Sequence, residues 1–279
     1  FALLNGRQRP GFIVFLTEGV PWVGETDVKA FLAGAAAMKG KDVLIFAFGV
    51  GYDVNTTLLD KLAEDHRGVA DYVEPGQKIE GKLARFSAKI RNPILTDLRF
   101  AVGGMAVYDL FPQEIPDLCA GDQIVLCGRY RGEGPARLSL SGKSRGKEIV
   151  RLIDGRFRSA AESNEGASFI ERLWASKQIG FLIDQIRFHG KSKELTDEIV
   201  RLSMKYGIVT EYTSFLIRED VVAQNRAAND ERARKEFDER LDVRSGLHGV
   251  KQSQNIAKMR QGNLANQNDW YFDERGERI

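Results

Sequence analysis

The feature that most constrains this fold is a regular alternation of apolar runs and helical segments between Gly11 and Arg91. The runs Phe12–Leu16 and Val43–Phe48 are apolar at every position, which is typical of strands covered on both faces of a sheet. Each run is followed by a turn and then by residues with helical periodicity. This order predicts an α/β fold with a parallel sheet and right-handed crossovers.

The alternation continues for one more strand and one more helix. A helix expected to end at Gly68 is followed by a short apolar strand at Asp71–Val73. Beyond it, apolar residues recur at intervals of four, three and four, which indicates one face of a third helix. These residues are Ile79, Leu83, Phe86 and Ile90.

The position of the first strand in the chain is unusual for such a sheet. Only eleven residues, beginning with Phe1, precede the strand that starts at Phe12. A central parallel strand needs neighbours on both sides. We therefore expect an upstream part of this domain to be absent from the chain.

After Pro93 the apolar period changes from helical to two. Leu98, Phe100 and Val102 alternate with other residues, and Gly103-Gly104 is typical of a hairpin turn. We expect an antiparallel, sandwich-like β region over residues 92–160, after an α/β part over residues 1–91. Its further strands are predicted at Met105–Phe111, Gln123–Tyr130, Ala136–Ser141 and Lys147–Ile153.

The last part of the chain reads as helical and then polar. Two apolar stripes, with a short connection near Gly190, predict an antiparallel helical hairpin over residues 161–217. We expect residues 218–279 to form a charged helix up to about Asp242 and a polar tail from Ser245, with Trp270–Phe272 resembling a strand. The stripes are Ile179, Leu182, Ile183 and Ile186, then Leu195, Ile199, Leu202 and Tyr206.

Composition excludes some classes of partner. The net charge of +2 provides no global field for nucleic acid or for a membrane surface. The longest apolar stretch, Ala30–Met38, is too short to cross a bilayer. We therefore expect no nucleic-acid partner and no membrane segment in this chain.

Several short motifs have a structural interpretation that we favour over a functional one. Gly49-Val-Gly51 lies where a dinucleotide fingerprint would, but position 54 is Val54, so we expect a tight strand-to-helix turn. Gly142-Lys-Ser144 lies between strands, not before a helix, and fails as a phosphate loop. Asp53-Val-Asn55-Thr-Thr57 has oxygen ligands in an order that suits Mg²⁺, but a helix N-terminus with a polar turn is the favoured interpretation.

The cysteines and histidines form no recognisable site. Cys119 and Cys127 lie in or beside β-type segments, where buried thiols are favoured over a local bridge. His66, His189 and His248 belong to no zinc spacing and to no nucleophile–base pair. We therefore expect a chain that is not an enzyme.

Three long stretches resemble the second half of a von Willebrand factor type A domain. They read FIVFLTEGVPWVGETD, VLIFAFGVGYDVNTTLLDKLAEDHRG and DYVEPGQKIEGKLARF. More narrowly, the chain resembles proteins that join such a domain to a VIT domain, as in inter-α-trypsin inhibitor heavy chains. The resemblance continues through ILTDLRF, VYDLFPQEIPDL and the helical hairpin, and it covers most of residues 11–217.

The resemblance implies a fold and a metal site. The fold would be the C-terminal half of a doubly wound sheet, with a divalent-metal adhesion site at its strand ends. The site's D-x-S-x-S motif and later Thr would lie upstream of Phe1, and its Asp corresponds to Glu18 in Thr17-Glu18-Gly19. We expect Mg²⁺ in the complete domain, with Glu18 as a ligand, but no Mg²⁺ bound by this chain.

The resemblance also implies a function class. We expect a non-enzymatic adhesion protein, secreted, periplasmic or on the cell surface, that binds a protein ligand through the von Willebrand A domain. The VIT domain and the first half of the von Willebrand A domain would lie upstream. An alternative is an intracellular scaffold of the vault-associated type that needs no metal. A peptidase or a maturation-associated subunit is a third option, for which the sequence names no catalytic residue.

Overall fold

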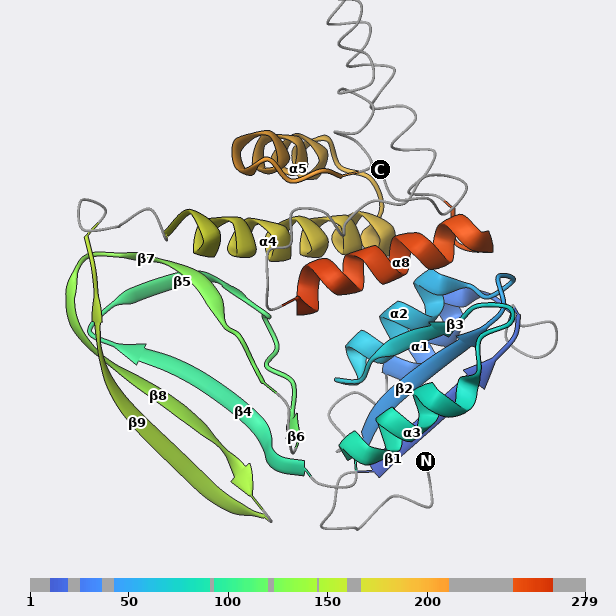
Figure 1. Ribbon diagram of the computed structural model, residues 1–279, viewed down its shortest axis with the longest axis horizontal. Coiled ribbons are helices and arrows are strands. Elements are labelled where there is room, and N and C mark those ends of the chain that lie inside the picture. The colour runs from blue at the N-terminus through green and yellow to red at the C-terminus, as the bar shows by residue number, and fades with distance from the viewer. Residues whose placement is uncertain are drawn as a thin grey trace, which may run out of the picture. The chain divides into compact units, whose positions relative to one another are not determined.

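The chain divides into two compact units (Figure 1). The first comprises Phe1–Gly51 and Leu58–Ala167, and the second comprises Tyr52–Thr57 and Ser168–Ile279. This computed structural model describes residues 11–19, 26–36, 43–90, 93–119, 123–144, 146–159, 167–210 and 243–262.

The first unit begins with a parallel three-stranded sheet in the order β1-β2-β3. Its strands are β1 (Gly11–Thr17), β2 (Val43–Val50) and β3 (Ala70–Val73), and both pairings are parallel. The helices α1 (Val28–Ala36), α2 (Thr56–Asp65) and α3 (Ile79–Ile90) alternate with these strands. The predicted α/β class and the order of its elements are confirmed.

Apolar side chains cover both faces of β2, as its continuous apolar run predicts, whereas β1 exposes Val14 and Leu16 on one face. On one face, Ile45 of β2 belongs to a buried cluster with Ala35 of α1 and Leu62 of α2. On the other face, the ring of Phe46 lies 4.3 Å from the ring of Phe86 of α3. Successive residues of one strand thus pack against helices on opposite faces, which is the arrangement of a doubly wound sheet.

The β region forms two antiparallel sheets within the same unit. The larger sheet has the order β6-β4-β8-β9, and the smaller pairs β5 with β7. Tyr130 connects them, because its ring lies 4.6 Å from Phe157 and its hydroxyl donates to the Arg158 carbonyl at 2.8 Å. The strands are β4 (Pro93–Gly103), β5 (Ala106–Phe111), β6 (Leu118–Cys119), β7 (Cys127–Arg131), β8 (Gly134–Ser144) and β9 (Lys147–Phe157).

The observed strands differ in length from the predicted ones. The strand expected to start at Gln123 starts at Cys127, while β8 and β9 both extend beyond their predicted ends. Long, continuous pairing between β8 and β9 holds polar residues such as Lys143 and Asp154 in the ladder. A search for alternating apolar residues underestimates the length of such strands. It stops at polar residues, although these residues still pair with the neighbouring strand.

The second unit contains the predicted antiparallel helical hairpin. Its helices are α4 (Ala167–His189) and α5 (Lys193–Tyr206). The ring of Trp174, early in α4, lies 6.4 Å from that of Tyr206 at the end of α5, so the helices run in opposite directions. Ser192 accepts a hydrogen bond from the Leu195 N–H as an N-cap, and Gly207 ends α5 in the left-handed region.

A third helix in this unit corrects the prediction of a polar tail from Ser245. Residues Gly246–Gln261 form α8, in which Val250, Ile256 and Met259 are buried together with polar Gln252. Sparse apolar residues and a partly polar buried face leave little helical periodicity to detect. The expected charged helix up to Asp242 and the expected strand at Trp270–Phe272 lie outside the described residues. The division into four domains stays a prediction.

Candidate functional site

The carboxyl end of β1 carries the residue predicted to bind metal. Thr17, the last residue of β1, lies beside Gly49 of β2. Its hydroxyl donates to the Gly19 carbonyl at 3.1 Å and also lies 3.4 Å from the Gly19 N–H. After this tight local turn, Glu18 is exposed at the carboxyl end of β1. In open α/β folds, ligands bind outside the carboxyl ends of the parallel strands.

The described residues around Glu18 do not fit a magnesium site. Mg²⁺ takes six oxygen ligands in nearly ideal octahedral geometry. In the parts of the chain that the structure describes, no group of three or more His, Cys, Asp or Glu side chains could hold a metal ion. Glu18 as a metal ligand therefore stays a prediction.

The other oxygen-rich segment, Tyr52–Thr57, is held by the second unit. The Thr56 N–H and hydroxyl both donate to the Arg244 carbonyl, at 2.8 and 3.0 Å. Gly246 donates its N–H to the Tyr52 carbonyl at 2.6 Å, and Arg187 donates to the Thr56 hydroxyl at 3.2 Å. These bonds, together with the complete burial of Thr56, give this motif a structural role at the start of α2.

A buried ionic cluster supports this segment from within the second unit. Asp184 of α4 accepts hydrogen bonds from Arg187 at 3.2 Å and from Arg260 of α8 at 2.6 Å. Lys177 donates to the Arg260 carbonyl at 2.9 Å. This cluster was not predicted, and the signal in the sequence was three charged residues among the apolar residues of α4, namely Lys177, Asp184 and Arg187.

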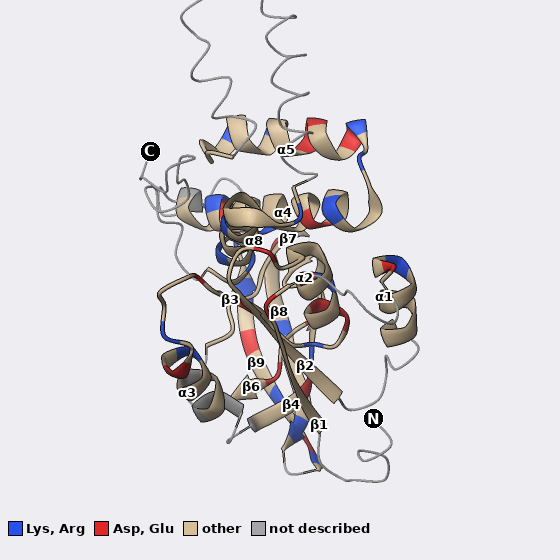
Figure 2. Cartoon of the chain, turned by 90° about the vertical axis from the view of Figure 1, so that its right-hand side faces the viewer, with Lys and Arg blue, Asp and Glu red and all other residues tan. Residues whose placement is uncertain are grey.

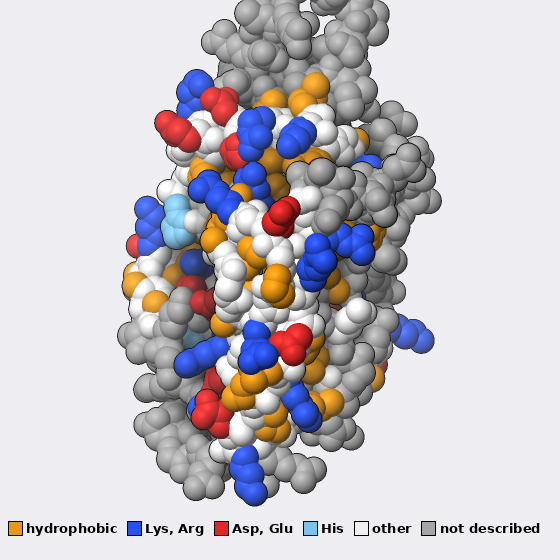
Figure 3. Space-filling model, turned by 90° about the vertical axis from the view of Figure 1, so that its left-hand side faces the viewer, with side chains coloured by type: hydrophobic (Ala, Val, Ile, Leu, Met, Phe, Trp, Pro, Cys, Tyr) orange, Lys and Arg blue, Asp and Glu red, His pale blue; other side chains and the backbone are white. Residues whose placement is uncertain are grey.

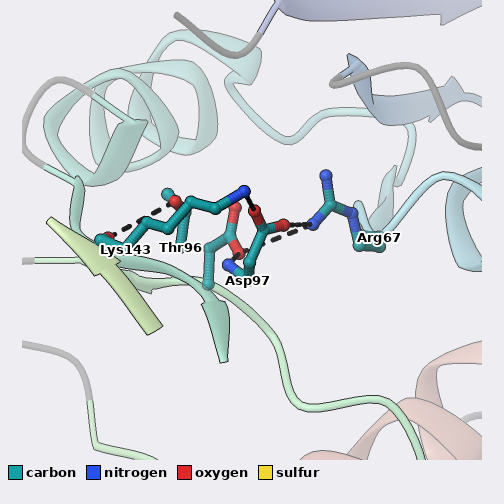
Figure 4. A network of polar contacts seen from close by, with 5 residues as sticks. Arg67, Thr96, Asp97 and Lys143 are labelled. Carbon is teal, nitrogen blue, oxygen red and sulfur yellow. Dashed lines mark hydrogen bonds and ion pairs between the residues drawn. The ribbon is translucent and has the colours of Figure 1, made fainter. Parts of the chain in front are cut away.

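A second polar network lies in the first unit (Figure 4). Asp97 of β4 accepts hydrogen bonds from Lys143 of β8 at 2.8 Å and from Arg67 at 2.9 Å. The Asp97 N–H donates to Asp117 at 3.1 Å. Arg67 and Asp97 both have φ near the left-handed region, at 54° and 53°. The network therefore joins the turn after α2 to the β region at two backbone positions of unusual conformation.

The charge on Asp97 is stabilised by this arrangement. The hydrogen bond from Lys143, followed by that from Arg67, lowers the pKa of Asp97, and these effects outweigh the opposing effect of its partial burial. Asp97 is thus held as a carboxylate. We assign the network a structural role, because its oxygens face residues of the chain itself.

The remaining motifs also have structural roles. Gly51 has φ of 82° and donates to the Val73 carbonyl at 2.9 Å, so the predicted tight turn is confirmed. The prediction of buried thiols is confirmed for Cys127, whereas Cys119 is a thiol that is only partly buried. His66 is buried, and its ring nitrogens lie 3.0 and 3.1 Å from the carbonyl oxygens of Leu62 and Ala35.

The exposed surface has two notable features in the first unit. Apolar residues are exposed on β1, at Val14 and Leu16, and on β9. On the small sheet, the guanidinium groups of Arg129 and Arg131 lie 5.2 and 5.3 Å from the centre of the Tyr108 ring. The face of the β region drawn in Figure 3 accordingly shows apolar side chains interspersed with Lys and Arg.

The helices of the second unit present a different surface. The exposed side of α5 carries both signs of charge (Figure 2), paired as Lys193–Asp197 at 2.6 Å and Glu198–Arg201 at 2.5 Å. Such exposed pairs contribute little to stability. Among the described helices, none combines the length and the apolar character needed to cross a membrane.

No model of a protein family matches the chain, but it is similar to part of several inter-alpha-trypsin inhibitor heavy chains. It is 26% identical to heavy chain H2 of Sus scrofa over 219 residues, which covers 75% of this chain and 23% of the relative. It is 27% identical to heavy chain H4 of Homo sapiens over 216 residues, covering 74% and 23%. It is 27% identical to heavy chain H6 of Homo sapiens over 256 residues, which covers 83% of this chain and 19% of the relative. The chain thus spans about a quarter of the length of these relatives or less.

Two solved structures are similar to the chain. One is the ArnB paralog VWA2 of Sulfolobus acidocaldarius, with a TM-score of 0.45 and 16% identity over 94% of this chain and 67% of that one. The other is a von Willebrand factor type A protein of Catenulispora acidiphila, with a TM-score of 0.42 and 16% identity, covering 70% and 55%. The sequence relatives are inter-alpha-trypsin inhibitor heavy chains, and the chain is similar to a part of them.

Proposed function

We propose that this chain is part of a secreted, non-enzymatic protein that binds another protein through its α/β domain. The observation that carries the proposal is the exposed carboxylate of Glu18 at the carboxyl end of β1, beside Gly19. In open α/β folds, ligands approach this edge of the sheet. A VIT domain and the first half of the α/β domain would be supplied by upstream sequence, as would the remaining metal ligands.

The experiment compares partner binding by the full-length protein and by its Glu18→Gln variant. Proteins captured from the extracellular fluid of the source are identified, purified and tested by surface plasmon resonance, with Mg²⁺ and with EDTA. We expect affinity for a specific partner to fall about tenfold or more in both EDTA and Glu18→Gln. Glu171→Gln is the matched control, because Glu171 is also exposed but lies on α4. Equal affinity of the Glu18→Gln protein would refute binding through Glu18.

A second candidate is a metal-independent scaffold inside the cell. It is favoured by Val14 and Leu16, which are 47% and 53% exposed on β1, since exposed apolar side chains on a strand are suited to protein contact. The same binding assay separates the two candidates. Binding that is unchanged in EDTA and by Glu18→Gln, but lost in Leu16→Lys, would support the scaffold.

A further inference from the structure

The last strand of the larger antiparallel sheet, β9, is a long and regular edge. In the order β6-β4-β8-β9, the described part of the chain places a neighbour on only one side of it. All eleven residues of Lys147–Phe157 pair with β8 in unbroken register. By contrast, the pairings of β4 and β5 contain register shifts. A regular edge without Pro or a bulge presents backbone N–H and C=O groups in the geometry that another strand requires.

Exposed apolar side chains lie along this same edge. Val150 and Leu152 are 53% and 62% exposed on one face, opposite Ser141 and Ser139 of β8. Ile153, on the other face, is 57% exposed. Single exposed apolar residues are ordinary, but three within four positions of an edge strand form a surface suited to pairing.

We infer that β9 pairs with β9 of a second copy of this chain, antiparallel and centred on Leu152. In a two-fold arrangement, residues equally distant from Leu152 face one another across the new ladder. Glu148 then lies opposite Arg156 of the second copy, and the symmetry forms this opposite-charge pair twice. Leu152 faces its own copy at the axis. In this register Val150 faces Asp154 and Arg151 faces Ile153, so the self-complementarity rests on Leu152 and on the Glu148–Arg156 pair.

Neighbouring registers are less favourable. A two-fold axis perpendicular to the sheet leaves each side chain on its own face of the sheet. Facing residues must therefore come from the same face, which requires the axis to pass through a residue and not between two residues. Centring on Arg151 would place Arg151 opposite itself and Glu148 opposite Asp154, which sets like charges against each other. Centring on Ile153 would pair Glu148 with Arg158 and Ile149 with Phe157, but it would place Leu152 opposite Asp154. We propose the register centred on Leu152, because the most exposed apolar side chain of β9, at 62%, then meets its own copy.

The association should be weak, because one strand pair buries less surface than a standard protein–protein interface. We expect a dissociation constant on the order of 10–100 µM. Sedimentation equilibrium of the chain should show an average mass that rises with concentration from 31.2 kDa towards twice that value. An average mass that stays at 31.2 kDa at concentrations above the expected dissociation constant would overturn the inference. That result would hold against self-pairing whether β9 binds another protein or stays exposed.

Two matched variants test whether β9 is the surface. Leu152→Lys places two positive charges against each other at the axis, so the dissociation constant should rise at least about tenfold. Met204→Lys is the control, because Met204 of α5 has the same exposure of 62%. Circular dichroism checks that both variants are folded. Self-association that survives Leu152→Lys would overturn the inference, because another surface would then be responsible.

A cysteine series tests the register. Facing residues of antiparallel strands have Cα atoms about 4.5–5.5 Å apart, which a disulfide can span. Oxidised Leu152→Cys should therefore form a covalent dimer more readily than Ile153→Cys, with the oxidised unmodified chain as the reference for Cys119 and Cys127. Preferential cross-linking through Ile153→Cys would refute the proposed register. This inference does not depend on Glu18, so it can fail without affecting the proposed function.

Discussion

Arg260 donates a hydrogen bond of 2.6 Å to Asp184, which lies 76 positions earlier in the chain. Asp184 also accepts from Arg187, and the side chains of this second pair are 4% and 1% exposed. A carboxylate so deeply buried needs compensating positive charge, and here two helices supply it. The Asp184 cluster therefore connects α8 to α4.

Replacing Asp184 by Asn should destabilise the second unit strongly. The substitution leaves Arg187 buried without the compensating carboxylate, and we expect a loss of about 3 kcal/mol in the free energy of unfolding. Urea denaturation followed by circular dichroism measures this change. Glu198→Gln, which removes an exposed carboxylate from α5, should cost about 0.5 kcal/mol or less. Equal effects of the two variants would show that the cluster does not stabilise the fold.

Replacing Gly68 by Ala should destabilise the first unit. A Cβ atom at position 68 would lie 1.7 Å from the carbonyl oxygen of Ile45, and a backbone atom of β2 cannot move aside cheaply. We expect a loss of about 3 kcal/mol in thermal or urea denaturation. Gly34 of α1 is the matched control, since a Cβ there meets nothing within 4 Å. Gly34→Ala should stabilise by about 0.5–1 kcal/mol, and a neutral Gly68→Ala would contradict the close approach.

Asp97 should make the stability of the first unit depend on pH. Hydrogen bonds from Lys143 and then Arg67 lower its pKa in the folded chain, so its contribution is present above the unfolded pKa and is lost as the pH falls through the folded value. Asp97→Asn should therefore cost about 1–2 kcal/mol at pH 7, and the difference from the unmodified chain should shrink below about pH 4. Asn tolerates the positive φ at this position, so the variant tests the charge.

The control for this pH dependence is Asp154→Asn. Asp154 also pairs with an arginine, Arg137, at 2.9 Å, but its side chain is 80% exposed. We expect no measurable change in stability between pH 3 and pH 7 for this variant. A difference between Asp97→Asn and the unmodified chain that stays constant over that range would show that the Asp97 charge contributes nothing.

The chain should not bind Mg²⁺ with micromolar affinity. In the described part of the chain, Glu18 belongs to no group of three metal-binding side chains, whereas Mg²⁺ requires several oxygen ligands in fixed geometry. Isothermal titration calorimetry up to about 1 mM Mg²⁺ tests this expectation. Heat that fits a micromolar site and disappears in Glu18→Gln would contradict it.

Local sequence patterns predicted the strands and helices in which apolar residues recur with a regular period. The apolar runs of β1 and β2 predicted strands covered on two faces; both strands were confirmed, but the two-sided cover was confirmed for β2 alone, because β1 exposes Val14 and Leu16. The stripes of α4 and α5 predicted the helical hairpin, which the contact between Trp174 and Tyr206 confirms. Such patterns succeed because the period of an apolar face is a property of a few successive residues.

The polar features were not predicted, because their partners are far apart in the chain. Arg67 and Asp97 are separated by 30 positions, and Asp184 and Arg260 by 76. The α8 helix was missed for a related reason, since Gln252 and Ser253 on its buried face resemble surface residues in the sequence. A charged or polar residue indicates burial only when its compensating partner is known.

Local sequence was sufficient to predict the α/β alternation, the change to an antiparallel β region and the helical hairpin, because each depends on residues close together in the chain. The folded chain was needed to show that Thr56 and Arg187, 131 positions apart, share a hydrogen bond. The folded chain also shows that Leu152 is exposed on an edge strand, whereas Leu98 of the same sheet is buried. Strand order and long-range pairing determine which side chains are covered, and a local pattern contains no information about either.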